Sequence, residues 1–242
     1  MVATCPPVAC ERLMDFSIVT GNFGIYLEGL WNTAQLVSLS LFIGLMMAIP
    51  LAVFVTSKNI LVNGPIRAYV YFFRGTPLLV QMFLIYYGMG QFDLVRNSIL
   101  WPFFKEAYFC ALFAFTLNTA AYTTEIIRGA IVATPHGEIE AATSTGMSRL
   151  LMLRRIILPS AFRRALPAYS NEIIFMLHGS SIASVITIVD ITGAARIVNS
   201  RFYSPYEAFL TAAVIYMALT FLIVWSVKKL EVRWFAHLRP QA

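Results

Sequence analysis

Polar side chains inside long apolar stretches are the residues of this chain that could do chemistry. An ionised group costs about 2.5–3.5 kcal/mol at the centre of a bilayer, so such residues are default candidates for a solute path. Carboxylates could bind a cationic group, while amide and hydroxyl groups could bind a carboxylate. The candidates are Arg74, Thr76, Asn118, Glu125, Glu172 and His178.

Several of these candidates also have a purely structural explanation. Glu125 and Glu172 could sit at the inner membrane interface and position neighbouring helices, and His178 could bridge two helices through hydrogen bonds. Arg74 could be an interfacial anchor, or it could pair with an acid. The sequence leaves both explanations open.

A second group of informative residues lies in a polar, helix-prone segment, residues 134–159. Thr134 can cap a first helix, with Pro135 at its first position, and Gly146 can end it in a hinge of positive φ. Ser148 can cap a second helix, which Pro159 then stops. These helices are too polar to insert, but one face is apolar, so a partner protein or the membrane surface must cover it.

The composition places these residues in a membrane protein. Hydrophobic residues make up 59% of the 242 residues and charged residues only 12%, and the mean hydropathy is +0.72. Each apolar run has about 17 residues or more, enough to cross roughly 30 Å of hydrocarbon as a helix. The loops between runs are too short for a second folded unit, so we expect one membrane domain. The runs cover residues 29–57, 75–92, 107–124, 173–189 and 208–227.

The second run contains a helix-start signal. Arg74 and Gly75 are followed by Thr76, which can cap a helix, and by Pro77, which suits a first helical position. We therefore expect this element to be bent or broken there.

Lysines and arginines predict the orientation, because cations that flank spans are retained in the cytoplasm. With the N-terminus outside, twelve of them fall in inner segments and five in outer segments, with Arg74 left out. This predicts a periplasmic N-terminus, a cytoplasmic C-terminus and a cytoplasmic segment 125–171. Asp190 and Glu207 would then face outward, either solvated or in contact with a delivering protein. The inner cations are Lys58, Arg67, Arg128, Arg149, Arg154, Arg155, Arg163, Arg164, Lys228, Lys229, Arg233 and Arg239, and the outer ones are Arg12, Arg96, Lys105, Arg196 and Arg201.

The sequence lacks the residues that other classes of protein would need for their function. No GxxxxGK[ST] phosphate loop occurs, so the chain cannot itself be an ATP-driven motor. No nucleophile with its base is visible, so we expect no enzymatic activity and no cofactor. The formal charge of +6 sits beside apolar spans as a topology signal, which argues against nucleic acid as a partner. The residues that could bind metal are scattered, so we expect no metal site: Cys5, Cys10, Cys110, His136, His178 and His237.

Specific spacings in the sequence resemble a known family. Residues 72–81, FFRGTPLLVQ, are similar to a segment of polar amino-acid permeases. Over residues 69–240 the chain resembles M-type permease subunits of histidine/lysine/arginine/ornithine and octopine/nopaline uptake systems, through LNTAAYTTEI, PHGEIEAA, LPAYSNE and EVRWFAHLRP. Departures lie mainly in the first 65 residues or so, where no motif is recognised. The remaining spacing resembles the EAA loop of ABC importer permeases and is formed by Glu140, Ala141, Ala142, Gly146, Ile156, Leu158 and Pro159.

The resemblance implies an all-α type I ABC importer permease fold over residues 1–242, with about five transmembrane helices in the bacterial inner membrane. It implies that residues 134–159 form a cytoplasmic loop whose EAA residues contact a separate ATPase; we call this segment the coupling loop. The implied partners are a companion Q-type permease, two ATP-binding subunits and a periplasmic solute-binding protein. The implied cargo is a basic amino acid or an opine. Glu125 and Glu172 would then suit a cationic cargo, and Asn118 and Thr76 its carboxylate.

The alternative is an ion-coupled secondary amino-acid transporter, which the intramembrane Glu, Asn and His residues would also suit. Such a carrier predicts inverted repeats and a self-sufficient set of spans. No convincing internal repeat is visible, and five spans are few for a lone carrier.

Overall fold

The computed structural model describes residues 15–234, and all regular structure in this range is helical. Cys5, Cys10, Arg12, His237 and Arg239 lie outside the described residues. The elements are α1 (Ser17–Gly21), α2 (Phe23–Val55), α3 (Ile60–Gly75), α4 (Leu78–Gly88), η1 (Met89–Gln91), α5 (Asp93–Arg96), α6 (Trp101–Phe104), α7 (Ala107–Val132), α8 (His136–Ser144), α9 (Arg149–Met152), η2 (Leu153–Ile157), α10 (Leu158–Gly179), η3 (Ser180–Ile186), α11 (Ile191–Phe202) and α12 (Pro205–Trp234).

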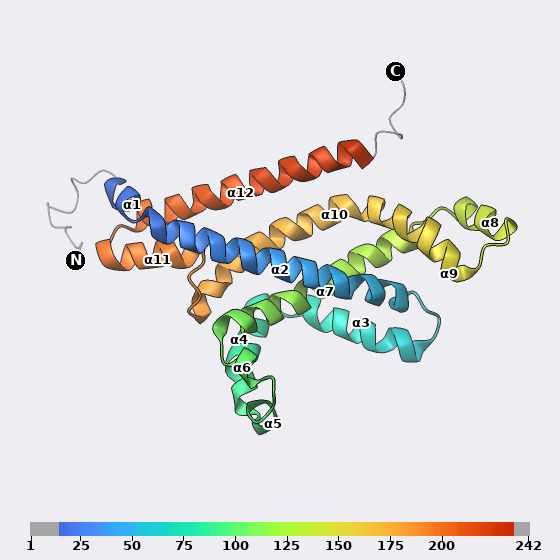
Figure 1. The fold of residues 1–242 in the computed structure, drawn as a ribbon, viewed down its shortest axis with the longest axis horizontal. Helices are drawn as coiled ribbons and strands as arrows, with labels where there is room; N and C mark the ends of the chain where they lie inside the picture. The colour runs from blue at the N-terminus through green and yellow to red at the C-terminus, as the bar shows by residue number, and fades with distance from the viewer. Residues whose placement is uncertain (1–14, 235–242) are drawn as a thin grey trace, which may run out of the picture.

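The long helices α2, α10 and α12 run roughly along the long axis of the molecule (Figure 1). The short helices α1 and α11 lie at one end of this axis, and α8 and α9 lie at the opposite end. Helices α4, α5 and α6 project to one side. The coupling loop is therefore separated from the start of α2 by the length of the bundle.

Helix α7 lies at the centre and packs against α2, α3, α4 and α10. Small residues let helix backbones approach closely. In a bilayer this close packing holds helices together, because lipid is as apolar as the side chains and the hydrophobic effect between helices is absent. A Cβ at Gly44 of α2 would overlap the methyl group of Thr119, so α2 and α7 meet without room for a side chain there. The small or hydroxyl-bearing buried residues of α7 are Ala111, Ala114, Thr116, Thr119, Ala120, Ala121, Thr123, Thr124 and Ala130.

Within residues 15–234, two helices are long and apolar enough to cross a membrane singly, namely α2 with 33 residues and α12 with 30. Two bent pairs could each form one more span: α3 with Leu78–Gln91, bent by 103°, and Arg149–Ile186 with α11, bent by 46°. Helix α7 has 26 residues, enough length for a span, but its threonines face other helices and lower its apolarity. The expected all-α membrane fold is confirmed. The second and fourth expected runs each form part of a bent pair, and residues 15–234 contain two to four candidate spans where about five were expected.

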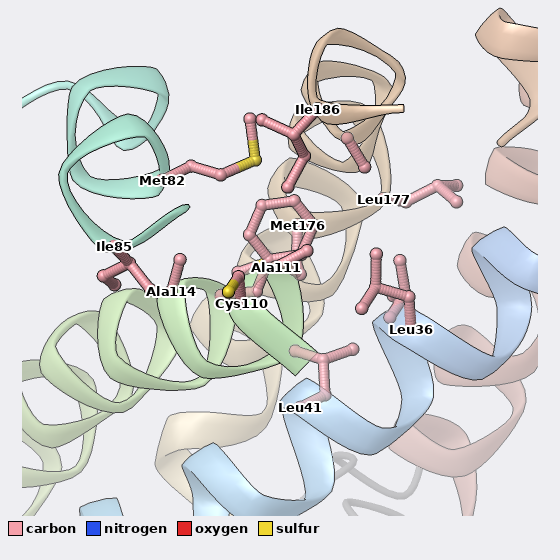
Figure 2. Close-up of a cluster of buried hydrophobic side chains, with 13 residues drawn as sticks. Leu36, Leu41, Met82, Ile85, Cys110, Ala111, Ala114, Met176, Leu177 and Ile186 are labelled. Carbon is pink, nitrogen blue, oxygen red and sulfur yellow. The ribbon is translucent and has the colours of Figure 1, made fainter. Parts of the chain in front are cut away.

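The largest apolar core joins the helices that surround the solute-path candidates (Figure 2). It draws on α2, α4, α7, α10 and η3, so segments from both halves of the sequence meet in one cluster. The labelled members are Leu36, Leu41, Met82, Ile85, Cys110, Ala111, Ala114, Met176, Leu177 and Ile186.

Asp190 joins three helices at the end of the molecule that holds α1 and α11. Its Oδ1 accepts a hydrogen bond from the backbone N–H of Gly193 at 2.7 Å, which caps α11, and its Oδ2 accepts one from the Tyr216 hydroxyl of α12 at 3.1 Å. A Cβ at Gly29 of α2 would lie 2.6 Å from the Asp190 carbonyl oxygen.

The expectation that the Asp190 and Glu207 side chains are solvated or contact a delivering protein is wrong, because both are buried. That they lie toward the outer side of the membrane stays a prediction. Asp190 is used as a helix cap, and the Glu207 carboxylate accepts a hydrogen bond from the backbone N–H of Asp15 at 3.1 Å. Neither carboxylate is a free surface charge.

Candidate solute path and coupling loop

A cavity of about 500 Å³ opens between the α3–α4 break, α7 and α10. Its volume lies within the range of about 300–1,000 Å³ that is typical of small-molecule sites. Four of the six solute-path candidates line it, so a cation, a hydroxyl, an amide and a carboxylate share one space. The lining residues are Arg74, Gly75, Thr76, Pro77, Leu78, Asn118, Tyr122, Glu172, Phe175 and Met176.

Glu172 supplies the carboxylate of this cavity from the middle of α10. Its side chain is 6% exposed, and the Thr119 hydroxyl of α7 donates to its Oε1 at 2.9 Å. The hydroxyl adds a hydrogen bond without adding a positive charge, so this bond leaves Glu172 without a fixed cationic partner. Glu172 is therefore arranged to attract a cationic group.

Gln81 of α4 organises the opposite wall of the cavity, although it was not among the residues predicted from the sequence. Its buried amide nitrogen donates to the Phe73 carbonyl at 2.8 Å and to the Thr76 hydroxyl at 2.7 Å. Its Oε1 accepts from the Asn118 amide of α7 at 3.0 Å. A glutamine inside an apolar run was the available signal, since such a group must find hydrogen-bond partners among neighbouring helices.

The α3–α4 break confirms the expected bend, but its capping differs from the prediction. The residue before a proline is pushed out of the helical region, and Thr76 is accordingly extended, with φ −114° and ψ 144°. Its hydroxyl donates back to the Phe72 carbonyl at 2.8 Å and does not cap α4. Pro77 itself stands at the cap position, so α4 begins at Leu78.

Arg74 lies at the boundary between two cavities. It lines the cavity that contains Glu172 and also a second one of about 310 Å³. Its guanidinium carbon lies 5.2 Å from the ring centroid of Tyr122, a cation–π arrangement. It forms no ion pair within residues 15–234. The cation therefore faces both spaces without being neutralised by a fixed acid.

Glu125 lines the second cavity, which it shares with Arg74 but not with Thr76, Asn118, Glu172 or His178. Both oxygens of its carboxylate accept from Arg128 one turn further along α7, with Nε to Oε2 at 2.9 Å. Arg67 and Arg74 of α3 line the same cavity. The surroundings of Glu125 are thus dominated by arginine, which suits a structural ion pair better than a site for cations.

His178 lies outside both cavities. Its Nε2 is 3.1 Å from the Thr220 hydroxyl of α12, and its ring packs edge-on against Tyr216 with centroids 6.5 Å apart. This geometry matches the bridging of two helices, α10 and α12, which was the structural explanation left open above.

The coupling loop contains the two short helices that the sequence predicts, α8 and α9. Gly146 ends α8 with a φ of +76°, and the chain reverses through two backbone bonds, Gly146 N–H to Thr143 at 3.0 Å and Met147 N–H to Ala142 at 3.1 Å. This is the Schellman pattern, in which the left-handed residue favours glycine. Ser148 then caps α9, accepting from the Leu151 N–H at 3.4 Å. Both predictions are confirmed.

The outer surface of α8 presents the Glu140 and Ala141 side chains, whereas Ala142 is buried. Glu138 lies in the first turn of α8, so the helix dipole acts on Glu138 more than on Glu140. Ile156 belongs to the π-helical turn η2, and Leu158 begins α10.

Two expected helix boundaries in this loop are wrong. Thr134 does not cap α8, because its hydroxyl donates to the Ile131 carbonyl at 2.7 Å, and Pro135 takes the cap position. Pro159 does not stop the second helix, because it lies in the first turn of α10, where a residue without an N–H loses no intrahelical bond. The chain continues from α9 through the π turn η2 into α10.

Comparison with known proteins identifies the family. Residues 40–235 match the model of the binding-protein-dependent transport system inner membrane component. The chain belongs to this family. It is a non-catalytic permease of the inner membrane, which rules out the ion-coupled carrier and the membrane-embedded enzyme. Family membership also implies ATPase and solute-binding-protein partners for this permease.

Similar proteins cover nearly the whole permease. The nopaline transport system permease protein NocM of Agrobacterium fabrum is 46% identical, over 94% of this chain and 95% of its own length. The histidine/lysine/arginine/ornithine transport system permease protein HisM of Escherichia coli strain K12 is 44% identical, over 90% and 92%. A crystal structure of an amino acid ABC transporter with histidines contains a chain with a TM-score of 0.81 and 34% identity, matched over 91% of this permease and 99% of that chain.

Proposed function

We propose that this permease carries a basic amino acid, such as histidine, arginine, lysine or ornithine, or an opine of the octopine and nopaline type. The observation that carries this proposal is the cavity in which Glu172, Asn118, Thr76 and Arg74 meet. The names of the similar permeases NocM and HisM support the same class of cargo.

The cavity has complementary groups for both ends of such a solute. The buried Glu172 carboxylate would pair with the cationic side chain, and the low dielectric around it would strengthen that attraction. The Arg74 guanidinium would bind the carboxylate of the solute. The Asn118 amide nitrogen already donates to Gln81 and to the Phe73 carbonyl, so Asn118 would line the cavity without donating to that carboxylate. A solute that carries both charges therefore suits the cavity better than a neutral one.

The coupling loop would transmit movement from the ATPase. In this proposal α8 presents the exposed Glu140 and Ala141 to a cleft of the ATP-binding subunit, and Gly146 sets the angle between α8 and α9. The exposed Arg149, Arg154 and Arg155 would meet acidic residues around that cleft. Ile156, Leu158 and Pro159 would connect the loop to α10, which bears Glu172.

The assembled importer in this proposal contains a companion Q-type permease, two ATP-binding subunits and a periplasmic solute-binding protein. The excess of lysine and arginine near the coupling loop supports a cytoplasmic loop, a periplasmic N-terminus and a cytoplasmic C-terminus. The exposed Phe175 at the cavity edge would be covered by the companion permease.

The test is uptake by the complete importer reconstituted in proteoliposomes with its ATPase, companion permease and binding protein. We expect ATP-dependent uptake of basic amino acids or of opines, and little uptake of glutamine. Glu172→Gln should raise the solute concentration for half-maximal uptake about 10–100-fold, because a charge-assisted hydrogen bond is replaced by a neutral one.

The matched control is Glu28→Gln, which makes the same charge change on an exposed residue of α2 away from the cavity. It should leave uptake unchanged. Equal sensitivity of the two variants, or unaltered uptake in Glu172→Gln, would remove Glu172 from the solute path. Equal uptake of neutral and basic amino acids by the unmodified importer would refute the proposed cargo.

A further inference from the structure

Arg164 of α10 connects the two ends of the coupling loop. Its Nε and Nη2 donate to the carbonyl of Ala130 at 3.2 and 3.1 Å, and Nη2 also donates to the Thr134 hydroxyl at 2.7 Å. Its Nη1 donates to the Ser160 hydroxyl at 2.6 Å. One guanidinium thus holds the last turn of α7, the start of the loop and the first turn of α10.

The Ala130 carbonyl is a suitable acceptor because it lies in the last turn of α7. The final carbonyls of a helix lack partners four residues further on, and they carry the negative end of the helix dipole. The N–H of Thr134, which would continue the helical pattern, bonds to Ile131 instead. Arg164 therefore satisfies both a hydrogen-bonding requirement and an electrostatic one.

Small buried side chains hold the two helices close beside this guanidinium. Ala130 of α7 packs with Ala161 and Ala165 of α10 in one apolar cluster. Close packing fixes the distance between the helix axes, and the planar fork of Arg164 fixes their register through several directional bonds. The base of the coupling loop is thus held from both sides.

The chain between these two attachment points contains a less regular element. Residues Leu153–Ile157 form a π-helical turn between α9 and α10. Such turns are rare and occur mostly as local bulges, often at functional sites. A displacement of α8 and α9 would therefore deform this turn before it moved the membrane-spanning helices.

We infer that Arg164 is a positioning residue that makes α7 and α10 move together with the coupling loop. Without it, movement of the loop would deform η2 and the loop base, and only part of it would reach Asn118 on α7 and Glu172 on α10. This inference rests on the proposed role of the coupling loop at the ATPase. It predicts a loss of coupling, not a loss of folding or of ATP hydrolysis.

The experiment measures solute transported per ATP hydrolysed by the complete importer in proteoliposomes. Arg164→Gln should keep ATP hydrolysis within about twofold and reduce the transported solute per ATP about tenfold, a size typical of coupling between sites. Arg164→Lys keeps the charge but replaces three separate donor nitrogens of a planar fork with one, so its ratio should be intermediate. Arg163→Gln, which removes the exposed neighbouring arginine, should leave the ratio unchanged.

A second measurement separates a positioning role from general stabilisation. Hydrogen–deuterium exchange should become faster in residues 133–160 of Arg164→Gln and stay unchanged in α2 and α12. If uptake and ATP hydrolysis fall in proportion, or if the ratio and the exchange both match the unmodified importer, the inference is refuted.

A third measurement tests the proposed function independently. The Glu140→Cys variant should cross-link to the ATP-binding subunit in both the otherwise unmodified and the Arg164→Gln backgrounds. Absence of this cross-link in both backgrounds would overturn the proposed role of the coupling loop. Cross-linking with an unchanged transport ratio would overturn only the role of Arg164.

Discussion

The Thr119 hydroxyl of α7 donates to the Glu172 carboxylate of α10 at 2.9 Å, and both side chains are buried. This bond links the central helix of the bundle to the helix that leads out of the coupling loop. It also fixes the orientation of the only carboxylate that lines the cavity at the α3–α4 break.

Thr119→Val should weaken this arrangement, because it keeps the shape but removes the hydroxyl donor. Leaving a buried polar group without its partner costs about 1–3 kcal/mol. We expect a lower thermal midpoint of the purified importer and an increase of several-fold in the solute concentration for half-maximal uptake. Thr119→Ser retains the hydroxyl and should restore uptake. If the valine and serine variants behave alike, the hydrogen bond has no role.

Gly44→Ala should separate α2 from α7. The added Cβ would overlap the Thr119 methyl group and lie 3.3 Å from the Ala120 nitrogen, and overpacking of this kind costs about 1–3 kcal/mol. Adding Thr119→Ser removes the overlapping methyl group, so the double variant should recover part of the lost thermal stability. If thermal stability does not recover, the overlap of the added Cβ with the backbone of α7, and not with the Thr119 methyl group, causes the loss.

Gly29→Ala should destabilise the opposite end of the bundle, because the new Cβ would meet the Asp190 backbone at 2.6–2.8 Å. Backbone cannot move aside as a flexible side chain can, so we expect a loss of about 1–3 kcal/mol in thermal unfolding of the importer. The control is Gly24→Ala on the same helix, where nothing lies within 4 Å. Similar midpoints for both variants would contradict the close approach of α2 and Asp190.

Gly146→Val should impair uptake while membrane insertion persists. A β-branched residue at a φ of +76° costs about 1–2 kcal/mol, although nothing lies within 4 Å of the new Cβ, so the effect acts on the α8–α9 turn alone. Gly146→Asn tolerates this conformation and should retain most of the uptake. Gly137→Ala, in open space without positive φ, should be neutral. Normal uptake by the valine variant would refute the hinge.

Local signals in the sequence were sufficient for much of this structure. Pro77 forces Thr76 out of the helical region, so the break before α4 follows from two adjacent residues. Gly146 adopts the left-handed conformation expected from its place after a short helix. The apolar runs correctly indicate a helical membrane fold because a bilayer permits few other structures.

The remaining features depend on contacts between distant residues. Gln81 and Asn118 are 37 residues apart, and only the fold shows that they share a hydrogen bond. Asp190 was predicted to be a solvated or partner-binding charge because it follows an apolar run, although the glycine three residues later is compatible with a helix cap. A proline is compatible with the end of one helix and with the start of another, so Pro159 alone does not distinguish the two. The structure shows a π turn that leads directly into α10, with Pro159 in its first turn.

The threonine-rich surface of α7 has a consequence for the synthesis of this protein. A translocon releases a segment into lipid according to its apolarity, and the buried Thr116, Thr119, Thr123 and Thr124 lower that tendency for α7. Its hydroxyl groups become acceptable in the bilayer only when neighbouring helices cover them. The strongly apolar α2 emerges from the ribosome before α7 and packs against it, so α2 is the first helix available to cover these hydroxyl groups. The Glu172 carboxylate that accepts from Thr119 arrives later, with α10.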